Sequence, residues 1–299
     1  MNWENEIVGF RNYLKLEKGL SENSIHAYVT DLLKLVQFLR DKGIDGGPDK
    51  VVLANLKAMM EDIAHKGISP RTQARVISGI KSFYKYLLIE EKVDRDPTAL
   101  LEAPRVGRKL PEILSVEEID SIINAIDNKK PEGQRNKAIL ETLYSCGLRV
   151  SELIDLKISN LFFESGFVKI EGKGSKERLV PISTKAIKEI NLYLSEYRRN
   201  LKISPVCEDV LFLNRRGKKL SRVMIFTIIK ALSQKVGLQK NISPHTFRHS
   251  FATHLIDGGA NLRAVQEMLG HESIITTEIY THLDKEYLKN TIIQFHPRS

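Results

Sequence analysis

The sequence predicts a mainly α-helical protein of two domains, in which a four-helix bundle precedes a mostly helical domain with a small antiparallel β-sheet. Three observations lead to this prediction. Apolar residues recur at helical spacing through the first hundred residues, a basic stretch with proline and glycine follows, and two strand-like runs beyond it flank a glycine-rich turn. The 299 residues are enough for two domains of ordinary size.

Four segments make up the predicted bundle. Residues 21–43 begin at Ser21, a residue type that caps helix N-termini, and residues 69–91 begin at Ser69, with proline at the first helical position. Residues 3–19 and 51–67 are the other two helical segments. Because amphipathic helices bury their apolar stripes against one another, four of them predict one compact bundle.

The last of these helices has a basic face, which is either a solvated surface or a surface that binds a polyanion. The segment alone favours neither, but the chain carries 46 Lys and Arg against 37 Asp and Glu, a net charge of +9. This excess favours a nucleic acid as the partner. We therefore expect a DNA-binding face made of Arg71, Arg75, Lys81 and Lys85.

The stretch from Pro104 to Pro111 contains Gly107 and shows no periodicity. This composition predicts an extended, positively charged linker. It places the domain boundary near residue 106, which divides the chain into residues 1–106 and 107–299. With a nucleic acid as the expected partner, we expect the cations of the linker to run along it, namely Arg105, Arg108 and Lys109.

The second domain begins with a helix, because Ser115 and Glu118 have the spacing of a capping box. Its predicted sheet lies in "GFVKIEGKGSKERLVPI", where Gly172 and Gly174 can supply the positive φ angles of a hairpin turn. Residues 209–221 resemble a further short strand and turn.

Several classes of protein are excluded or disfavoured. No apolar run approaches the roughly 18 residues that span a bilayer, so we expect no membrane insertion. The N-terminus, "MNWENEIVGF", has neither the basic nor the apolar region of a secretory signal. Two cysteines, Cys146 and Cys207, are too few for a disulfide framework, which favours a cytoplasmic protein. No GxxxxGK[ST] loop is present, so nucleotide hydrolysis is not suggested.

The stretch "SPHTFRHSFATHL" concentrates three histidines and an arginine in one helical segment. His245 lies in its first turn and Arg248 one turn later, beside the free N–H groups of the helix N-terminus, which favours an anion pocket. The alternative is zinc on His245 and His249. His254 lies five residues beyond His249 and therefore on another face, and no acidic ligand is near, so we prefer the anion pocket and give His249 and His254 structural roles.

Other motifs contribute further candidate site residues. In chain order the full set is Arg149, Lys173, His245, Arg248, His271 and Tyr280. The set matches, in residue type and order, the active site of the tyrosine recombinases. The phrases "GLRVSEL", "GKGSKERLVP", "HTFRHSFATHL" and "LGHESIITTEIYTH" resemble the bacterial Xer members of that family. The resemblance covers essentially the whole chain. It implies a SAM-like DNA-binding bundle followed by a catalytic domain.

The resemblance also implies a mechanism. Tyr280 would attack the scissile phosphate and form a 3′-phosphotyrosine, and Lys173 would protonate the leaving 5′ oxygen. Arg149 and Arg248 would hold the non-bridging oxygens, with His271 as a further donor and His245 helping to move the proton. Because guanidinium groups supply the charge stabilisation, we expect no metal and no cofactor. We expect Glu152 to support Arg149 by a salt bridge.

The sequence leaves open alternatives for two site residues and for the class of protein. Lys176 is a rival to Lys173 on the same hairpin, and Tyr287 is a rival to Tyr280. A type IB topoisomerase uses a similar set of residues, and a mobile-element integrase shares the catalytic motifs. The alternative that is not an enzyme is a DNA-binding protein that has lost catalysis.

The resemblance implies partners as well. They are double-stranded DNA with a dif-like site, a XerC-type recombinase in a heterotetramer on that DNA, and an FtsK-type DNA translocase that activates the reaction. The task would be resolving chromosome dimers through a Holliday junction. The last segment, "DKEYLKNTIIQFHPRS", has an apolar set that includes Leu288 and Ile292. We expect it to dock on a neighbouring protomer, and the alternative is that it folds back on its own domain.

Overall fold

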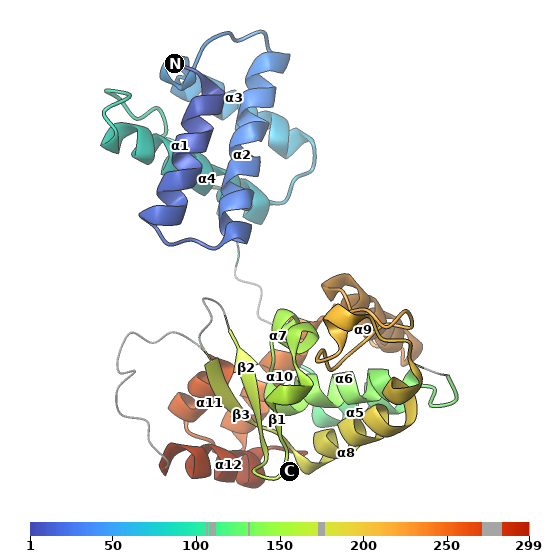
Figure 1. The fold of residues 1–299 in the computed structure, drawn as a ribbon. Coiled ribbons are helices and arrows are strands. Elements are labelled where there is room, and N and C mark those ends of the chain that lie inside the picture. The colour runs from blue at the N-terminus through green and yellow to red at the C-terminus, as the bar shows by residue number, and fades with distance from the viewer. Residues whose placement is uncertain (106, 108–111, 131, 173–176, 271–282, 299) are drawn as a thin grey trace. The chain divides into compact units, whose positions relative to one another are not determined.

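The computed structural model describes residues 1–105, 107, 112–130, 132–172, 177–270 and 283–298 (Figure 1). The chain is mostly helical with one small antiparallel sheet, which confirms the predicted fold class. It divides into two compact units, Met1–Lys109 and Leu110–Ser299. No helix in the described part of the chain is long and apolar enough to cross a membrane.

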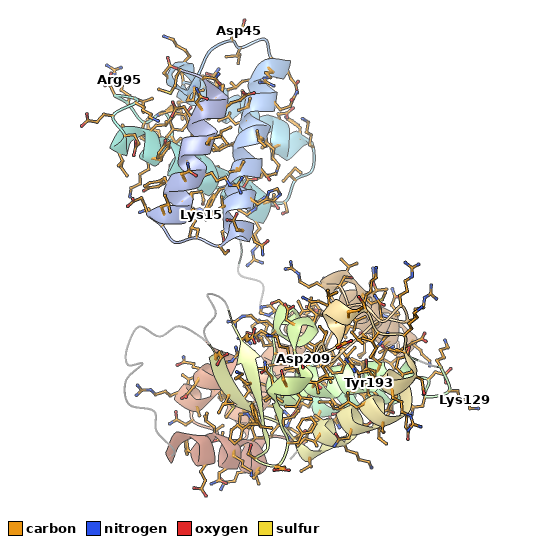
Figure 2. The ribbon with its side chains drawn as sticks, in the orientation of Figure 1. Lys15, Asp45, Arg95, Lys129, Tyr193 and Asp209 are labelled. Carbon is orange, nitrogen blue, oxygen red and sulfur yellow. The ribbon has the colours of Figure 1, made fainter. Side chains whose placement is uncertain are left out.

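The N-terminal unit is built from four helices, α1 (Trp3–Leu16), α2 (Glu22–Asp41), α3 (Leu53–His65) and α4 (Pro70–Ile89). Ser21 and Ser69 cap α2 and α4 as predicted, because their hydroxyls accept the backbone N–H groups of Ser24 and Thr72. The helices bury a core that includes Phe10 and Phe83. Charged side chains such as Lys15, Asp45 and Arg95 lie at the periphery of the unit (Figure 2).

The C-terminal unit holds the sheet and the remaining α-helices of the described chain. The helices are α5 (Val116–Asn124), α6 (Gly133–Cys146), α7 (Val150–Asp155), α8 (Thr184–Leu192), α9 (Arg222–Lys235), α10 (Pro244–Asp257), α11 (Leu262–Leu269) and α12 (Leu283–Phe295). The predicted capping box at the start of α5 is confirmed, with Ser115 and Glu118 each accepting the other's backbone N–H.

The sheet has the order β1 (Leu161–Phe162), β2 (Phe167–Glu171), β3 (Glu177–Pro181), and both pairings are antiparallel. The strands β2 and β3 are the two runs predicted on either side of the glycine-rich turn. In residues 209–221 the predicted turn is confirmed and the predicted strand is wrong. Val210 and Leu213 each form an isolated bridge, with Lys157 and Lys219, because the turn at Asn214–Gly217 follows at once and leaves no room for a ladder.

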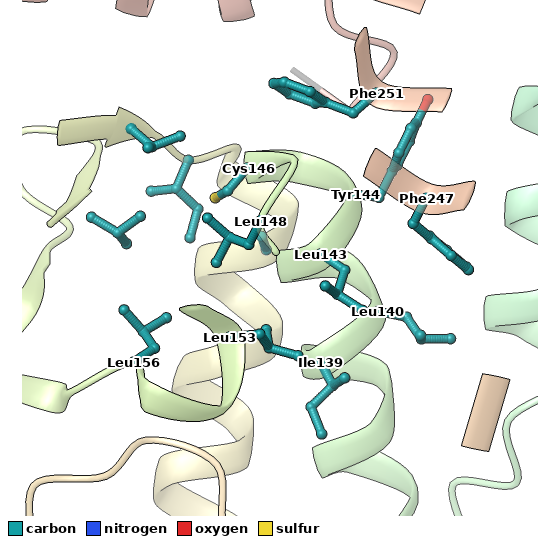
Figure 3. Packing of buried hydrophobic residues seen from close by; sticks show 14 of the residues in the cluster. Ile139, Leu140, Leu143, Tyr144, Cys146, Leu148, Leu153, Leu156, Phe247 and Phe251 are labelled. Atoms are coloured by element: carbon teal, nitrogen blue, oxygen red, sulfur yellow. The ribbon is translucent and has the colours of Figure 1, made fainter. Parts of the chain in front are cut away.

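Helix α6 runs through the core of the C-terminal unit, and eleven of its fourteen residues are buried. Neighbouring helices contribute the side chains that surround it (Figure 3). The packed set drawn there includes Ile139, Leu140, Leu143, Tyr144, Leu153, Leu156, Phe247 and Phe251. Burial on all sides explains why α6 shows little of the amphipathic pattern of a surface helix.

The C-terminal segment packs in part on its own domain, while Tyr287 and Ile293 of its apolar set are 52% and 55% exposed. Docking of this segment on a neighbouring protomer stays a prediction. Helix α12 contacts β3, α10 and α11, and it buries Leu288 and Ile292. Beyond the helix, the ring of His296 packs among buried residues and its Nε2 donates to the carbonyl oxygen of Tyr144 at 3.2 Å. Arg298 is buried as well, with Nε 3.4 Å from a carboxylate oxygen of Glu141.

Candidate active site

The site is centred on Glu152, which lies in the first turn of α7 and is 5% exposed. Helix α6 ends at Gly147, whose φ of 57° turns the chain sharply, so that Arg149 becomes the N-terminal cap residue of α7. The carboxylate of Glu152 accepts the backbone N–H and Nη1 of Arg149, each at 2.8 Å. The structure therefore contains the salt bridge expected between these two residues.

A third residue, Arg178 of β3, completes this cluster and was missed by the sequence reasoning. Its Nη1 and Nη2 donate to the two carboxylate oxygens of Glu152, each at 2.9 Å. The available signal was strand alternation. Arg178 is two residues from the buried Val180 and pairs with the buried Ile170, so it stands on the side of the strand that faces the core. A cation at such a position needs a buried acceptor.

The guanidinium groups are also held by carbonyl groups at the ends of two helices. Arg248 of α10 donates to the carbonyl oxygens of Gly147 at 2.8 Å and Leu269 at 2.6 Å. Arg149 donates to Gly270 at 3.2 Å. Carbonyl groups in the last turn of a helix have no partner within the helix, so they are available as acceptors. The C-terminal ends of α6 and α11 thereby bring the two predicted arginines together.

The described residues of the cluster carry a net positive charge, because the guanidinium groups of Arg149, Arg178 and Arg248 surround the one carboxylate of Glu152. Burial alone would raise the pKa of Glu152, but hydrogen bonds and charge from Arg178, with hydrogen bonds from Arg149, more than offset burial and hold that pKa below its usual value. Burial and repulsion by Arg149 lower the pKa of Arg248 to about 10, which leaves it charged at pH 7. This arrangement of guanidinium groups is suited to binding an anion.

His245 lies near this cluster in the first turn of α10, where it is exposed while its neighbours Pro244 and Thr246 are buried. Partial burial lowers its pKa, and electrostatic interaction with His249, Arg248 and Arg149 lowers it further. The imidazole of His245 is therefore neutral at pH 7 and able to accept a proton.

The ring centroids of His245 and His249, the two ligands of the zinc alternative, lie 4.3 Å apart. His254 hydrogen-bonds through Nδ1 to the hydroxyl of Tyr144 at 2.7 Å. Among the residues that the structure describes, no group of three or more His, Cys, Asp or Glu side chains is placed to hold a metal ion.

Several predicted site residues lie outside the described residues, namely Lys173, its rival Lys176, His271 and Tyr280. Tyr287, the rival nucleophile, lies on α12 and is 52% exposed. The structure thus brings together Arg149, Arg248 and His245 from the predicted set.

The predicted DNA-binding residues Arg71, Arg75, Lys81 and Lys85 of α4 are all exposed, as is Arg105 in the linker. Arg75 also forms an ion pair with Asp31, a fully buried residue of α2. Arg108 and Lys109 lie outside the described residues. A second exposed basic surface, missed by the sequence reasoning although "NRRGKK" signals it, is formed by Arg215, Arg216, Lys218 and Arg222.

Comparison with known proteins identifies the class. Residues 112–287 match the phage integrase family, and residues 7–91 match the N-terminal SAM-like domain of phage integrases. The chain belongs to the phage integrase family, that of the tyrosine recombinases, and is an enzyme that cuts and rejoins DNA.

Relatives named tyrosine recombinase XerD resemble it over nearly the whole chain. The Chlorobaculum tepidum protein is 42% identical over 99% of this chain and 97% of its own length. The Oceanobacillus iheyensis protein is 43% identical over 99% of both chains.

Solved structures agree with the fold. A lambda integrase dimer bound to a COC′ core site matches with a TM-score of 0.71 at 15% identity, over 94% of this chain and 99% of that one. The XerH recombinase in a post-cleavage complex with a palindromic difH substrate matches with a TM-score of 0.70 at 23% identity, over 96% of this chain and 88% of that one.

Proposed function

We propose that this enzyme is a site-specific recombinase of the XerD type, which exchanges DNA strands at a dif-like site together with a XerC-type partner. The observation that carries the proposal is the cluster of Arg149 and Arg248 around the single carboxylate of Glu152. Among the described residues, one carboxylate faces three guanidinium groups, which leaves two positive charges uncompensated. A phosphodiester in the transition state of transfer gains negative charge on its non-bridging oxygens. Guanidinium donors fixed in advance stabilise that charge without any rearrangement during the reaction.

The proposed reaction needs no external energy source. The hydroxyl of Tyr280 attacks phosphorus, the bond to the 5′ oxygen breaks, and Lys173 gives that oxygen a proton. The neutral imidazole of His245 takes up the proton of the tyrosine, and His271 donates to a non-bridging oxygen. The 3′-phosphotyrosine stores the energy of the broken bond, so a 5′ hydroxyl of another strand can reverse the step and create a Holliday junction.

The wider task follows from the relatives. Tyrosine recombinases named XerD are similar over nearly the full chain, and this supports chromosome-dimer resolution in the cytoplasm, with activation by an FtsK-type translocase. The exposed cations of α4 and of Arg215–Arg222 supply contacts to the DNA backbone. Affinity based on such contacts falls steeply as salt rises.

The proposal is tested by trapping the covalent intermediate. The protein is mixed, in EDTA, with a nicked suicide duplex that carries a dif-like site, with and without a XerC-type partner, and the products are separated under denaturing conditions. We expect a protein–DNA adduct that disappears in Tyr280→Phe and persists in the matched control Tyr287→Phe. An adduct lost only in Tyr287→Phe would move the nucleophile. Intact DNA binding with no adduct, even with the partner present, would overturn the proposal.

A further inference from the structure

Arg178 is a buried cation whose donors are directed to other parts of the protein. Its side chain is 14% exposed, and it stands where the strand pattern calls for an apolar residue. Both of its terminal nitrogens donate to Glu152 in a bidentate pair, and Nε donates to the carbonyl oxygen of Met268 at 2.9 Å. A guanidinium bonded in this way has its planar fork on a carboxylate of the protein and does not offer that fork to a substrate.

Glu152 links Arg178 to Arg149, because its carboxylate is hydrogen-bonded to both. Its Oε1 accepts Nη1 of both arginines, while its Oε2 accepts Nη2 of Arg178 and the backbone N–H of Arg149. Arg178 therefore supplies two of the four hydrogen bonds that hold this carboxylate. Without them, only the two hydrogen bonds from Arg149 hold the carboxylate, which can then shift toward Arg248, whose Nη1 is 4.0 Å from Oε2.

The contact with Met268 fixes a second element of the site. The next two carbonyl groups along the chain, those of Leu269 and Gly270, bind Arg248 and Arg149. Three consecutive carbonyl oxygens at the end of α11 thus accept three arginines. A Cβ added to Gly270 would lie 3.2 Å from the guanidinium of Arg178, so the close approach of these two residues depends on the glycine.

We propose that Arg178 is a positioning residue for the strand-exchange reaction. It locks the carboxylate of Glu152 and the C-terminal end of α11, and in this way aims the guanidinium of Arg149 at the scissile phosphate. The inference rests on the proposed function and deepens it, because it adds a residue that acts through Arg149 and does not touch the DNA.

The test measures cleavage separately from binding. Arg178→Gln removes the bidentate pair, Arg178→Lys keeps the charge with a single contact, and Arg135→Gln is the matched control. Arg135 is also buried and donates to a carbonyl oxygen, that of Leu213, but lies roughly 18 Å along α6 from Gly147 at 1.5 Å per residue. Single-turnover adduct formation at saturating protein gives the rate constant of cleavage, and titration at a fixed salt concentration gives the Kd.

We expect Arg178→Gln to slow cleavage by about 10- to 100-fold, the range seen when residues that orient a site's ligands are removed, with Kd changed less than about twofold. Arg178→Lys should recover part of the rate, and Arg135→Gln should cleave like the unaltered protein. In a double-mutant cycle, Arg178→Gln should cost little once Arg149→Lys is present, because the residue that it positions is already altered. If the two substitutions instead reduced the cleavage rate independently, so that their fold-reductions multiplied in the double variant, the inference would be overturned.

A structural readout keeps the inference testable even if the proposed function fails. In 15N-labelled full-length protein, the Nε–H signal of Arg149 is assigned by its loss in Arg149→Lys. We expect this signal to shift or broaden in Arg178→Gln and to stay in place in Arg135→Gln. An unchanged signal in Arg178→Gln would overturn the positioning role. Absence of any adduct from the unaltered protein would count against the proposed function alone.

Discussion

The turn at Gly147 gives the sharpest test of how the site is built. Gly147 adopts a φ of 57° and its carbonyl oxygen accepts Nη1 of Arg248. A Cβ at this position would lie 2.8 Å from Cε1 of Phe251, whose ring is fully buried. Gly147→Ala therefore combines a left-handed backbone, which costs about 1–2 kcal/mol, with overpacking of the core, which costs about 1–3 kcal/mol.

Gly237→Ala isolates the backbone contribution. Gly237 follows α9 in the same unit and has a φ of 72°, but nothing lies within 4 Å of an added Cβ. Its replacement should cost only about 1–2 kcal/mol. At about 2–4 °C per kcal/mol for a unit of this size, we expect Tm to fall by roughly 4–20 °C for Gly147→Ala and by roughly 2–8 °C for Gly237→Ala.

Thermal and urea unfolding of the two variants side by side provide the measurement. Cleavage by folded Gly147→Ala should also be slower, because a shift of the Gly147 carbonyl moves the acceptor of Arg248. Equal destabilisation by the two substitutions would show that Phe251 yields to the added methyl group, and would refute the reasoning from its packing.

Two further predictions concern the C-terminal tail. Burial lowers the pKa of His296 from 6.5 to about 3. The unfolded chain therefore binds a proton at the His296 imidazole more tightly than the folded protein does. As pH drops from 6.5 toward 3, the free energy of unfolding should fall by up to about 1.4 kcal/mol per pH unit. Acid titration of His296→Gln should show a smaller slope over that window, and an equal slope would contradict the assignment. Arg298→Ala leaves Glu141 buried with Lys185 as its remaining cation, at 3.4 Å, and should lower the free energy of urea unfolding by about 3–5 kcal/mol. The pair Arg298→Met with Glu141→Gln should recover most of this loss, and no recovery would argue that the ion pair of Arg298 with Asp120, and not its contact with Glu141, carries the stability.

Local signals in the sequence were sufficient for much of the fold. A serine hydroxyl that caps a helix acts within three residues, so Ser21, Ser69 and Ser115 could be read without the tertiary structure. The two strands around the glycine-rich turn have the same local origin. The tail was harder, because an apolar stripe predicts that Leu288 and Ile292 are buried but does not say against which surface.

The candidate site was predictable in its residue types and not in its connections. Arg149 and Arg248 could be found from the motifs. The strand alternation marks Arg178 as a residue on the core side, but its partner Glu152 follows only from the tertiary structure. The carbonyl groups that hold the arginines leave no mark in the sequence, since every residue has one. Their use as acceptors depends on where α6 and α11 end relative to each other, which is a tertiary property.

Those carbonyl groups explain how one protein can order three like charges in a small volume. A carbonyl group is neutral overall, so the ends of α6 and α11 orient Arg149, Arg178 and Arg248 without cancelling their charge. Among the residues that the structure describes, Glu152 alone carries a compensating charge in this cluster, and it is shared among them. If carboxylates had replaced the carbonyl groups, the arginines would be equally well placed but the cluster would be close to neutral. Holding guanidinium groups mainly by helix ends is therefore what leaves positive charge available for a phosphate.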